Sequence, residues 1–229
     1  MKAMILAAGR GERMRPLTDF VPKALLEVGG RALIEWHLLR LAACGIRDVV
    51  VNHAHLGPMI EARLGDGSRY GVRLIYSREP QALETAGAVA LALSWLGEQP
   101  FLLVNADIYT DFDFAQLERE SRDLPAGCDA CLVLVDNPPH HPHGDFALVG
   151  GRVAAEGEPR LTYSGIGAYR PRFFADIAPG TKAPLGPRLR QAAAAGRVRG
   201  LHHHGRWIDV GTPERLEHAR AMARAGEGR

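Results

Sequence analysis

The chain has 229 residues and a formal net charge of +2, with 46% hydrophobic and 24% charged residues. This length and balance predict a globular protein with a sizeable core, and the small net charge argues against a nucleic-acid or membrane partner. No apolar run approaches the roughly 18–20 residues of a membrane span, and the N-terminal apolar stretch is too short for a signal peptide, so we expect a cytoplasmic protein.

Short apolar runs recur through the first 135 residues. They are rich in Val, Ile and Leu and are continuous rather than alternating, which is typical of strands buried on both faces of a parallel sheet. The expected strands are Lys2–Ala7, Asp48–His53, Val72–Ser77, Phe101–Asn105 and Ala130–Val135.

Helical patterns separate these strands. Ile34, Leu38 and Leu41 share one helical face, and Gly45 follows as a stop signal. Further helices are expected at Leu56–Leu64, Glu84–Leu96 and Asp113–Arg122, with Asp111 as the N-terminal signal of the last. The βα order predicts an α/β fold, in which helices flank a doubly wound, mostly parallel, Rossmann-like sheet.

The pattern changes after Asp136, where a loop rich in Pro, His and Gly begins. We expect a hairpin turning at Gly150-Gly151, a strand in LTYSGIGAYRP, a helix over 185–195, a strand in GRWIDVG, and a C-terminal helix opened by Thr212-Pro213-Glu214. There is no linker or repeat, so residues 1–229 are expected to form one domain with an elaborated C-terminal half.

A glycine-rich turn, Leu6–Thr18, directly follows the first strand. Gly9 and Gly11 leave room for backbone N–H groups to approach a phosphate, and Arg13 supplies positive charge. Two familiar phosphate motifs are excluded, because the chain contains no Gly-Lys pair for a P-loop and has Met14 where a dinucleotide fingerprint needs its third glycine.

Lysine and cysteine usage give two further observations. Only three of the 28 basic residues are lysines (Lys2, Lys23 and Lys182), which suggests that an ammonium group was required at those positions. Cys128 and Cys131 form a C-x-x-C pair beside an expected strand, and we interpret them as structural rather than redox or metal-binding.

The turn and the following Pro22-Lys23-Ala24-Leu25 resemble the signature of the sugar-1-phosphate nucleotidyltransferases. The resemblance extends to LETAG at 83–87, Asn105-Ala106-Asp107 and WIDVGT at 207–212, and so covers nearly the whole chain. The strings VNHA, LETAG and DVGTPERL are most similar to bacterial N-acetylmuramate-1-phosphate uridylyltransferases of peptidoglycan recycling.

The resemblance implies that residues 1–136 bind the nucleotide and residues 137–229 bind the sugar. It implies transfer of UMP from UTP to a sugar 1-phosphate with release of pyrophosphate, by a monomer or small homo-oligomer. Lys23 and Arg13 would be catalytic. The implied nucleotide-binding residues are Ala7, Ala8, Gly9, Gly11, Arg13, Lys23, Glu79, Glu84, Thr85 and Gly87.

Two acids are implied to share a Mg²⁺ ion. Asp107 ends an apolar strand, where α/β sheets bind ligands, and Asp209 also follows apolar residues. Mg²⁺ favours one or two carboxylates together with phosphate oxygens. Asp107 and Asp209 are therefore the expected metal ligands.

On the sugar side the resemblance points to Asn105, Gly144, Glu158 and Gly165. Many relatives have E-K-P where this chain has Gly157-Glu158-Pro159, so Arg160 or Arg170 is expected to replace the missing lysine.

Relatives often have glycine at the position of Glu84, which leaves the base assignment open. The histidine clusters at 140–143 and 202–204 are interpreted as loop polarity, because consecutive histidines on a strand cannot all converge.

Two other functions stay open from the residues alone. A metal-dependent glycosyltransferase also uses an acidic motif after a strand, but has no need of the glycine-rich turn or Lys23. A non-catalytic nucleotide-sensing subunit would be expected to lose one of the two metal acids, and both are present.

Overall fold

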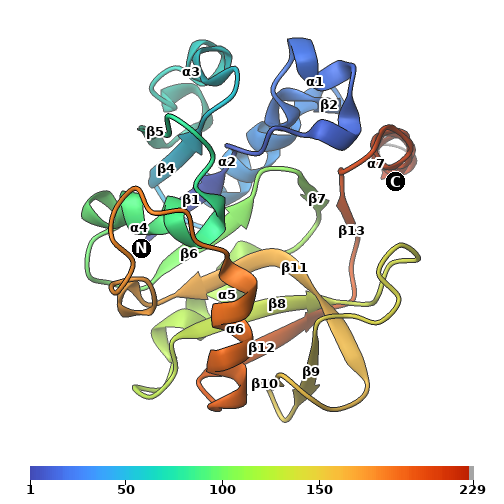
Figure 1. Ribbon diagram of the computed structural model, residues 1–229. Coiled ribbons are helices and arrows are strands. Elements are labelled where there is room, and N and C mark those ends of the chain that lie inside the picture. The colour runs from blue at the N-terminus through green and yellow to red at the C-terminus, as the bar shows by residue number, and fades with distance from the viewer. Residues whose placement is uncertain (227–229) are drawn as a thin grey trace.

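Nine strands form one continuous sheet in the computed structural model, which describes residues 1–226 (Figure 1). Their order across the sheet is β5-β4-β1-β6-β11-β8-β12-β10-β9, and all except β10 and β11 run in the same direction. The strands are β1 (Lys2–Leu6), β4 (Asp48–His53), β5 (Arg73–Arg78), β6 (Phe101–Asn105), β8 (Ala130–Val135), β9 (Phe146–Val149), β10 (Arg152–Ala154), β11 (Arg160–Tyr169) and β12 (Val198–His203).

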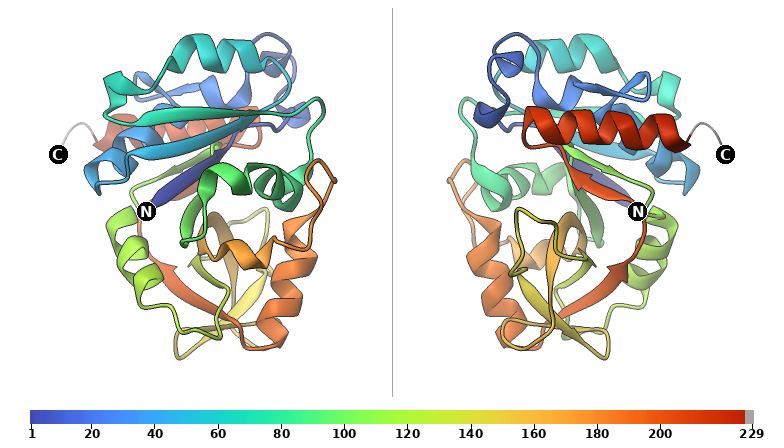
Figure 2. Two further views of the ribbon diagram at one scale, coloured as in Figure 1. Left: turned by 90° about the vertical axis from the view of Figure 1, so that its left-hand side faces the viewer. Right: turned by 90° about the vertical axis from the view of Figure 1, so that its right-hand side faces the viewer.

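Helices cover both faces of this sheet, as expected for a doubly wound fold (Figure 2). On one face Leu38 and Leu117 are buried against β1, β4, β6 and β8, and on the other Val89 and Leu189 are buried against the opposite side chains of the same sheet. The covering helices are α2 (Leu33–Ala43), α3 (Gly57–Leu64) and α5 (Phe114–Arg122) on the first face, and α4 (Glu84–Leu96) and α6 (Leu185–Ala194) on the second.

A small second sheet returns the C-terminal part of the chain to the end of β6. It pairs β7 (Ile108–Thr110) with β13 (Trp207–Asp209) in antiparallel register. The next helix, α7 (Pro213–Gly226), contributes Leu216 and Ala219 to a third apolar cluster beside β13 and the short strand β2 (Glu27–Val28), which pairs with β3 (Arg31–Ala32). This arrangement places β13 next to the carboxyl edge of the parallel strands (Figures 1 and 2).

The predicted elements are confirmed, with their bounds shifted by a few residues at most. Strand β12 was missed because VRGLHH has no apolar run, and it is held between β8 and β10 by its backbone ladder. Asp113 rather than Asp111 caps α5, since its Oδ1 accepts a hydrogen bond from the Ala115 N–H at 2.9 Å. Burial raises the pKa of the Cys131 thiol to about 12, which agrees with a structural role.

No helix within residues 1–226 combines the length and apolar character needed to cross a membrane.

Candidate functional site

A cavity of about 360 Å³ opens where β1, β4 and β6 end. Ligands bind in α/β folds at this carboxyl edge, because the loops that follow parallel strands converge there. Six sequence segments meet around it: the glycine-rich turn, the Lys23-Ala24 segment, the end of β4, the segment before α4, the turn after β6 and the loop before α6. The lining residues are Leu6, Ala7, Ala8, Gly9, Lys23, Ala24, Asn52, Glu79, Ala82, Glu84, Thr85, Asn105, Ala106, Asp107 and Lys182.

The glycine-rich turn is fixed from both sides. The Ala7 N–H donates to Asn52 Oδ1 at 2.9 Å, and the Thr18 hydroxyl donates to the Gly11 carbonyl at 2.8 Å. Gly11 has φ of +67°, and a Cβ there would lie 2.9 Å from the Thr18 methyl group and 3.3 Å from the Lys23 side chain. A glycine is therefore required at Gly11, where a side chain would be strained and would crowd Thr18 and Lys23.

Glu79 supports the wall of the cavity from within. Its carboxylate is buried, accepts a hydrogen bond from Asn52 Nδ2 at 2.7 Å and accepts another from the Leu83 N–H at 2.9 Å. Burial raises the pKa of Glu79 above its ordinary value. Both oxygens are thus already engaged, so Glu79 orients Asn52, whose other amide atom holds Ala7.

The segment at the start of α4 has an uncommon backbone. Glu84 lies in the left-handed region with φ of +59°, a backbone conformation that glycine adopts most readily. Its carboxylate pairs with Lys182 Nζ at 3.4 Å. Thr85 faces the cavity, whereas Gly87 is buried behind it, where a Cβ would lie 2.2 Å from the Thr181 carbonyl. Gly87 therefore allows close approach of the loop that carries Lys182.

The two predicted metal acids lie side by side, Asp107 directly before β7 and Asp209 at the end of its partner strand β13. Asp209 is in register with Ile108, and the Val210 N–H donates to the Asp107 carbonyl at 2.8 Å. Asp107 lines the first cavity, and both acids line a second cavity of about 370 Å³. The sequence brings these acids together although 102 positions separate their numbers.

Each acid has a cationic partner. Lys23 forms an ion pair with Asp107, and both side chains are mostly buried. Arg215 Nη1 donates to both oxygens of Asp209, at 2.9 and 2.7 Å, and His140 Nε2 lies 3.0 Å from the same carboxylate. The carboxylate charges are therefore neutralised locally in this state.

The second cavity borders the first through Asn105 and Asp107. It is lined by Arg13, Asn105, Asp107, Ile108, His140, His141, Thr162, Tyr163, Ser164, Gly165, Trp207, Asp209 and Arg215. Gly165 has φ of +78° at a bulge in β11, and a Cβ there would lie 2.6 Å from Asn105 Nδ2. Gly165 thus lets Asn105 stand between the two cavities.

Two predicted sugar residues lie elsewhere. Gly144 (φ +59°) packs against Asn137 Oδ1, and Glu158 is exposed and accepts a hydrogen bond from the Arg160 N–H. Neither expected substitute for the missing lysine lines either cavity, because Arg160 donates to the Asp145 carbonyl and Arg170 to the carbonyls of residues 124 and 128. Their charges are used to hold the backbone.

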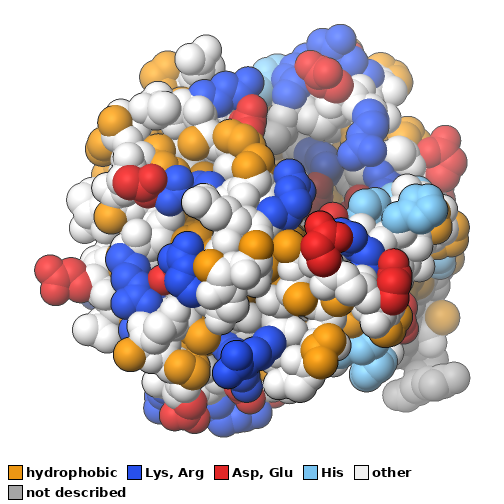
Figure 3. All heavy atoms as spheres, turned by 60° about the horizontal axis from the view of Figure 1, so that its bottom comes forward, with side chains coloured by type: hydrophobic (Ala, Val, Ile, Leu, Met, Phe, Trp, Pro, Cys, Tyr) orange, Lys and Arg blue, Asp and Glu red, His pale blue; other side chains and the backbone are white. Residues whose placement is uncertain are grey.

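The lining residues that sequence reasoning missed as site residues include Asn52, His140, Lys182 and Arg215. The scarcity of lysine was a usable signal for Lys182, since two of the three lysines line the first cavity while Lys2 donates to the Trp95 carbonyl. Nothing distinguished Arg215 among so many arginines. A space-filling view shows a hollow bordered by Lys and Arg side chains, with histidines near its edge (Figure 3).

A buried histidine lies in α2, close enough to Asp107 for their charges to interact. Burial of His37 lowers its pKa from 6.5 to about 4. Between these values the unfolded chain binds a proton that the folded chain excludes, so the free energy of unfolding should fall as the pH drops from 6.5 to 4, by up to about 1.4 kcal/mol per pH unit. Urea unfolding at pH 7, 6 and 5 should show a shallower pH dependence for His37→Leu. An equal slope in both proteins would contradict this assignment.

The comparisons with known proteins agree with this geometry. Residues 2–155 match the family model described as nucleotidyl transferase. N-acetylmuramate alpha-1-phosphate uridylyltransferases from Neisseria meningitidis serogroup B and Caulobacter vibrioides are 54% and 38% identical, covering 98% and 93% of this chain and 99% and 92% of their own lengths.

A solved structure from Bacillus anthracis, of a protein assigned as a glucose-1-phosphate thymidylyltransferase, has the same fold. It superposes with a TM-score of 0.87 at 24% identity and covers 98% of this chain and 95% of its own. The family match, the two full-length relatives and the paired acids beside the glycine-rich turn lead to one conclusion. The chain belongs to the nucleotidyl transferase family, as an enzyme of its sugar-1-phosphate nucleotidyltransferase group.

Proposed function

We propose that the enzyme transfers UMP from UTP to N-acetylmuramate 1-phosphate, giving UDP-N-acetylmuramate and pyrophosphate, in the cytoplasm during peptidoglycan recycling. The choice of substrates is supported by the 54% identical relative of that name, which the chain matches over nearly its full length. The structural observation that carries the chemistry is that Asp107 and Asp209 lie side by side in the second cavity, with Asp107 also lining the first.

The two cavities suit the two substrates. We assign the first cavity to UTP, since the glycine-rich turn, Lys23, Asn52 and Thr85 line it. The second is assigned to the sugar phosphate, and most of its lining comes from residues 137–229. In this assignment residues 1–136 are the nucleotide-binding half, with Lys182 contributed by the other half, and the substrates meet at Asn105 and Asp107.

The donor set fits Mg²⁺. Asp107 and Asp209 offer carboxylate oxygens, which are the hard ligands that Mg²⁺ prefers, and phosphate oxygens would complete its shell. When bound, Mg²⁺ would supply positive charge at the phosphates of UTP. The ammonium of Lys23 and the guanidinium of Arg215, now paired with these acids, become available to phosphate oxygens once the carboxylates are otherwise neutralised.

The reaction needs positioning more than proton transfer. An oxygen of the sugar phosphate, already anionic, attacks the α-phosphorus of UTP, while the bond from that phosphorus to the β-phosphate oxygen breaks and its electron pair leaves with pyrophosphate. Lys23 stabilises the charge that develops on the leaving group, and Arg13, which borders the second cavity, lies where it can neutralise phosphate charge.

Arg215 is our candidate for the sugar-phosphate cation that replaces the family's lysine. Its side chain is 13% exposed and lines the second cavity beside Asp209. Because a hydrogen bond to a charged group contributes about 1.5–3 kcal/mol, Arg215→Ala should raise KM for the sugar phosphate roughly 10–150-fold and leave KM for UTP nearly unchanged.

Arg160→Ala is the matched control, since Arg160 lines neither cavity and should leave both KM values near wild type. A fall in kcat alone in Arg215→Ala, with both KM values unchanged, would show that Arg215 acts through Asp209 and does not bind the sugar phosphate.

A matrix of nucleoside triphosphates and sugar 1-phosphates, measured by pyrophosphate release, tests substrate choice. UTP should have the highest kcat/KM, followed by dTTP, since only a methyl group and the ribose 2′-hydroxyl distinguish the two. Asn52 offers the first cavity an amide held by Glu79, and backbone groups beside it can pair with a pyrimidine edge. A clear preference for GTP, CTP or ATP would overturn the UTP proposal.

A further inference from the structure

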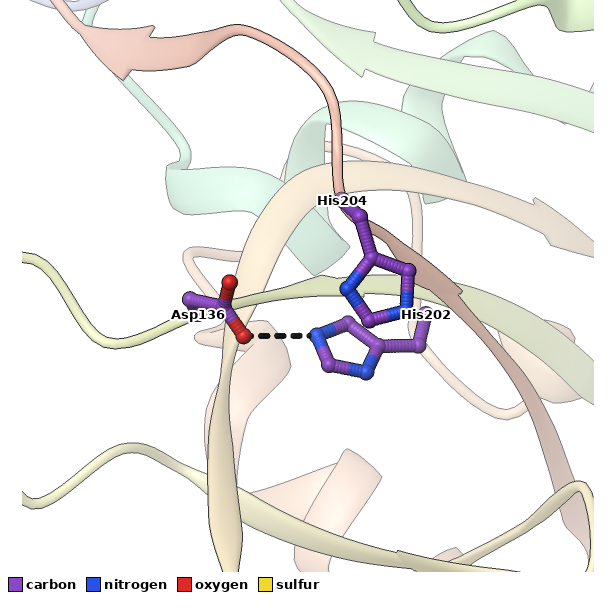
Figure 4. Close-up of side chains that lie close together, drawn as sticks. All are labelled: Asp136, His202 and His204. Atoms are coloured by element: carbon purple, nitrogen blue, oxygen red, sulfur yellow. Dashed lines mark hydrogen bonds and ion pairs between the residues drawn. The ribbon is translucent and has the colours of Figure 1, made fainter.

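Three side chains outside the two cavities converge on the surface beyond β8 and β12. His202 Nε2 lies 2.8 Å from Asp136 Oδ1, and the rings of His202 and His204 are 3.8 Å apart between centroids. Within residues 1–226, one ligand atom from each of these three residues lies within 4.8 Å of the others. Figure 4 shows the two imidazoles side by side with the carboxylate directed at one of them.

The strand geometry explains this convergence. His204 directly follows β12 and continues its alternation, so His202 and His204 point the same way while His203 points to the other side, where its Nε2 lies 3.1 Å from Asp111. β8 and β12 are parallel neighbours with His203 in register with Val135, which places Asp136 beside His204. The three histidines do not all converge, as expected, but alternate ones do.

The donor chemistry is that of a transition-metal site. Two imidazoles and one carboxylate are a common three-ligand set for Zn²⁺, with a fourth position open to water. Ligands at about 2.0–2.1 Å from a tetrahedral ion lie roughly 3.3 Å from one another, so the three donor atoms need to move little. Imidazole nitrogen also distinguishes this site from the all-carboxylate pair Asp107 and Asp209, which suits Mg²⁺.

We propose that Asp136, His202 and His204 form a second metal site, which binds Zn²⁺ or a similar divalent transition metal. An ion there would join the end of β8 to the end of β12. The segment after β8 carries His140, and the segment after β12 leads through β13 to Asp209, so the ion would hold together the two segments that meet where His140 contacts Asp209.

The test is Zn²⁺ titration against a chromogenic chelator, with Mg²⁺ in excess, for wild type and four variants. Wild type should bind one Zn²⁺ per chain at the new site, and His202→Ala and His204→Ala should each weaken this binding at least 30-fold. Asp209→Asn should retain Zn²⁺ binding, which would show that the new site is distinct from the Asp107–Asp209 pair. His143→Ala, which removes an exposed histidine outside the cluster, should also retain it.

Thermal melts give an independent readout. A free Zn²⁺ concentration 100 times Kd should raise Tm by about 5–10 °C in wild type and in His143→Ala, but not in His204→Ala. Without metal, His204→Ala should melt close to wild type because His204 is exposed. The proposal would be overturned if wild type did not bind Zn²⁺ stoichiometrically. It would also be overturned if both His202→Ala and His204→Ala kept the wild-type Zn²⁺ affinity and Tm shift.

Discussion

Asp107→Asn and Asp209→Asn are each expected to lower kcat by about 10³-fold or more, since each removes one full charge from the proposed Mg²⁺ shell. Both acids are about one quarter exposed, but their partners Lys23 and Arg215 are only 15% and 13% exposed, so the loss of either carboxylate charge should lower Tm as well as kcat. Each substitution also leaves a cation, Lys23 or Arg215, without its carboxylate partner. The measurement is steady-state pyrophosphate release at saturating substrates, with and without added Mg²⁺.

Asp176→Asn is the matched control, because it removes an exposed carboxylate that is paired with Arg188 and lies away from both cavities. It should retain normal turnover. Chelation by EDTA should abolish wild-type activity, and added Mg²⁺ should restore it. Near-normal turnover in both Asp107→Asn and Asp209→Asn, together with indifference to EDTA, would contradict the two-acid site.

Lys23→Ala should lower kcat by about 10²–10³-fold, or roughly 3–4 kcal/mol, by analogy with the loss of one preorganised donor. The reason is that an ammonium follows charge onto the leaving pyrophosphate, an interaction that is stronger in the transition state than in the ground state. Lys23→Arg keeps the charge but spreads it over a larger planar group, so it should recover only part of the activity.

Steady-state kinetics combined with thermal melts distinguish catalysis from folding. Lys23 pairs with Asp107 in the absence of substrate, so a small change of Tm is expected along with the large change of kcat. Lys2→Ala serves as the control, since Lys2 contacts the Trp95 carbonyl away from the cavities. If Lys23→Ala melts early but turns over normally per folded molecule, Lys23 is structural and the catalytic assignment is wrong.

Most of the fold could be predicted from the sequence, because the central strands are buried on both faces. Runs such as Phe101–Asn105 and Ala130–Val135 leave few alternatives to strands in a parallel sheet, and their order indicated the crossovers. β12 was not predicted because VRGLHH has neither an apolar run nor a regular alternation, and its pairing partner β8 lies more than 60 positions away. Long-range pairing of that kind has no local signal.

Less of the site could be predicted from the sequence, because its ion pairs and hydrogen bonds depend on which distant segments meet in the fold. The resemblance pointed to Lys23, Asp107 and Asp209, and the fold brings them together. It did not indicate that Arg215 donates hydrogen bonds to Asp209, or that Glu79 accepts a hydrogen bond from Asn52 Nδ2. These contacts join segments whose separation in sequence carries no motif, so they emerge only from the tertiary structure.

The left-handed backbone at Glu84 is a feature for which the sequence did carry a local signal. Its φ of +59° is a local property, and the glycine that the resemblance implies at this position was an available signal for it, but that departure was interpreted only as leaving the base assignment open. The carboxylate that this chain carries instead reaches Lys182 on the loop before α6. Glu84, which differs from the family pattern, thus forms an ion pair with Lys182 beside the first cavity.

The proposed function depends on one reaction, the coupling of UTP to N-acetylmuramate 1-phosphate at the Asp107–Asp209 site. Phosphorus NMR of purified protein with both substrates and Mg²⁺ tests it most directly. The proposed mechanism predicts that UDP-N-acetylmuramate and pyrophosphate form in equal amounts, and that Asp209→Asn forms neither. Hydrolysis of UTP without a sugar nucleotide, or product formation from another sugar 1-phosphate but not from this one, would contradict the claim.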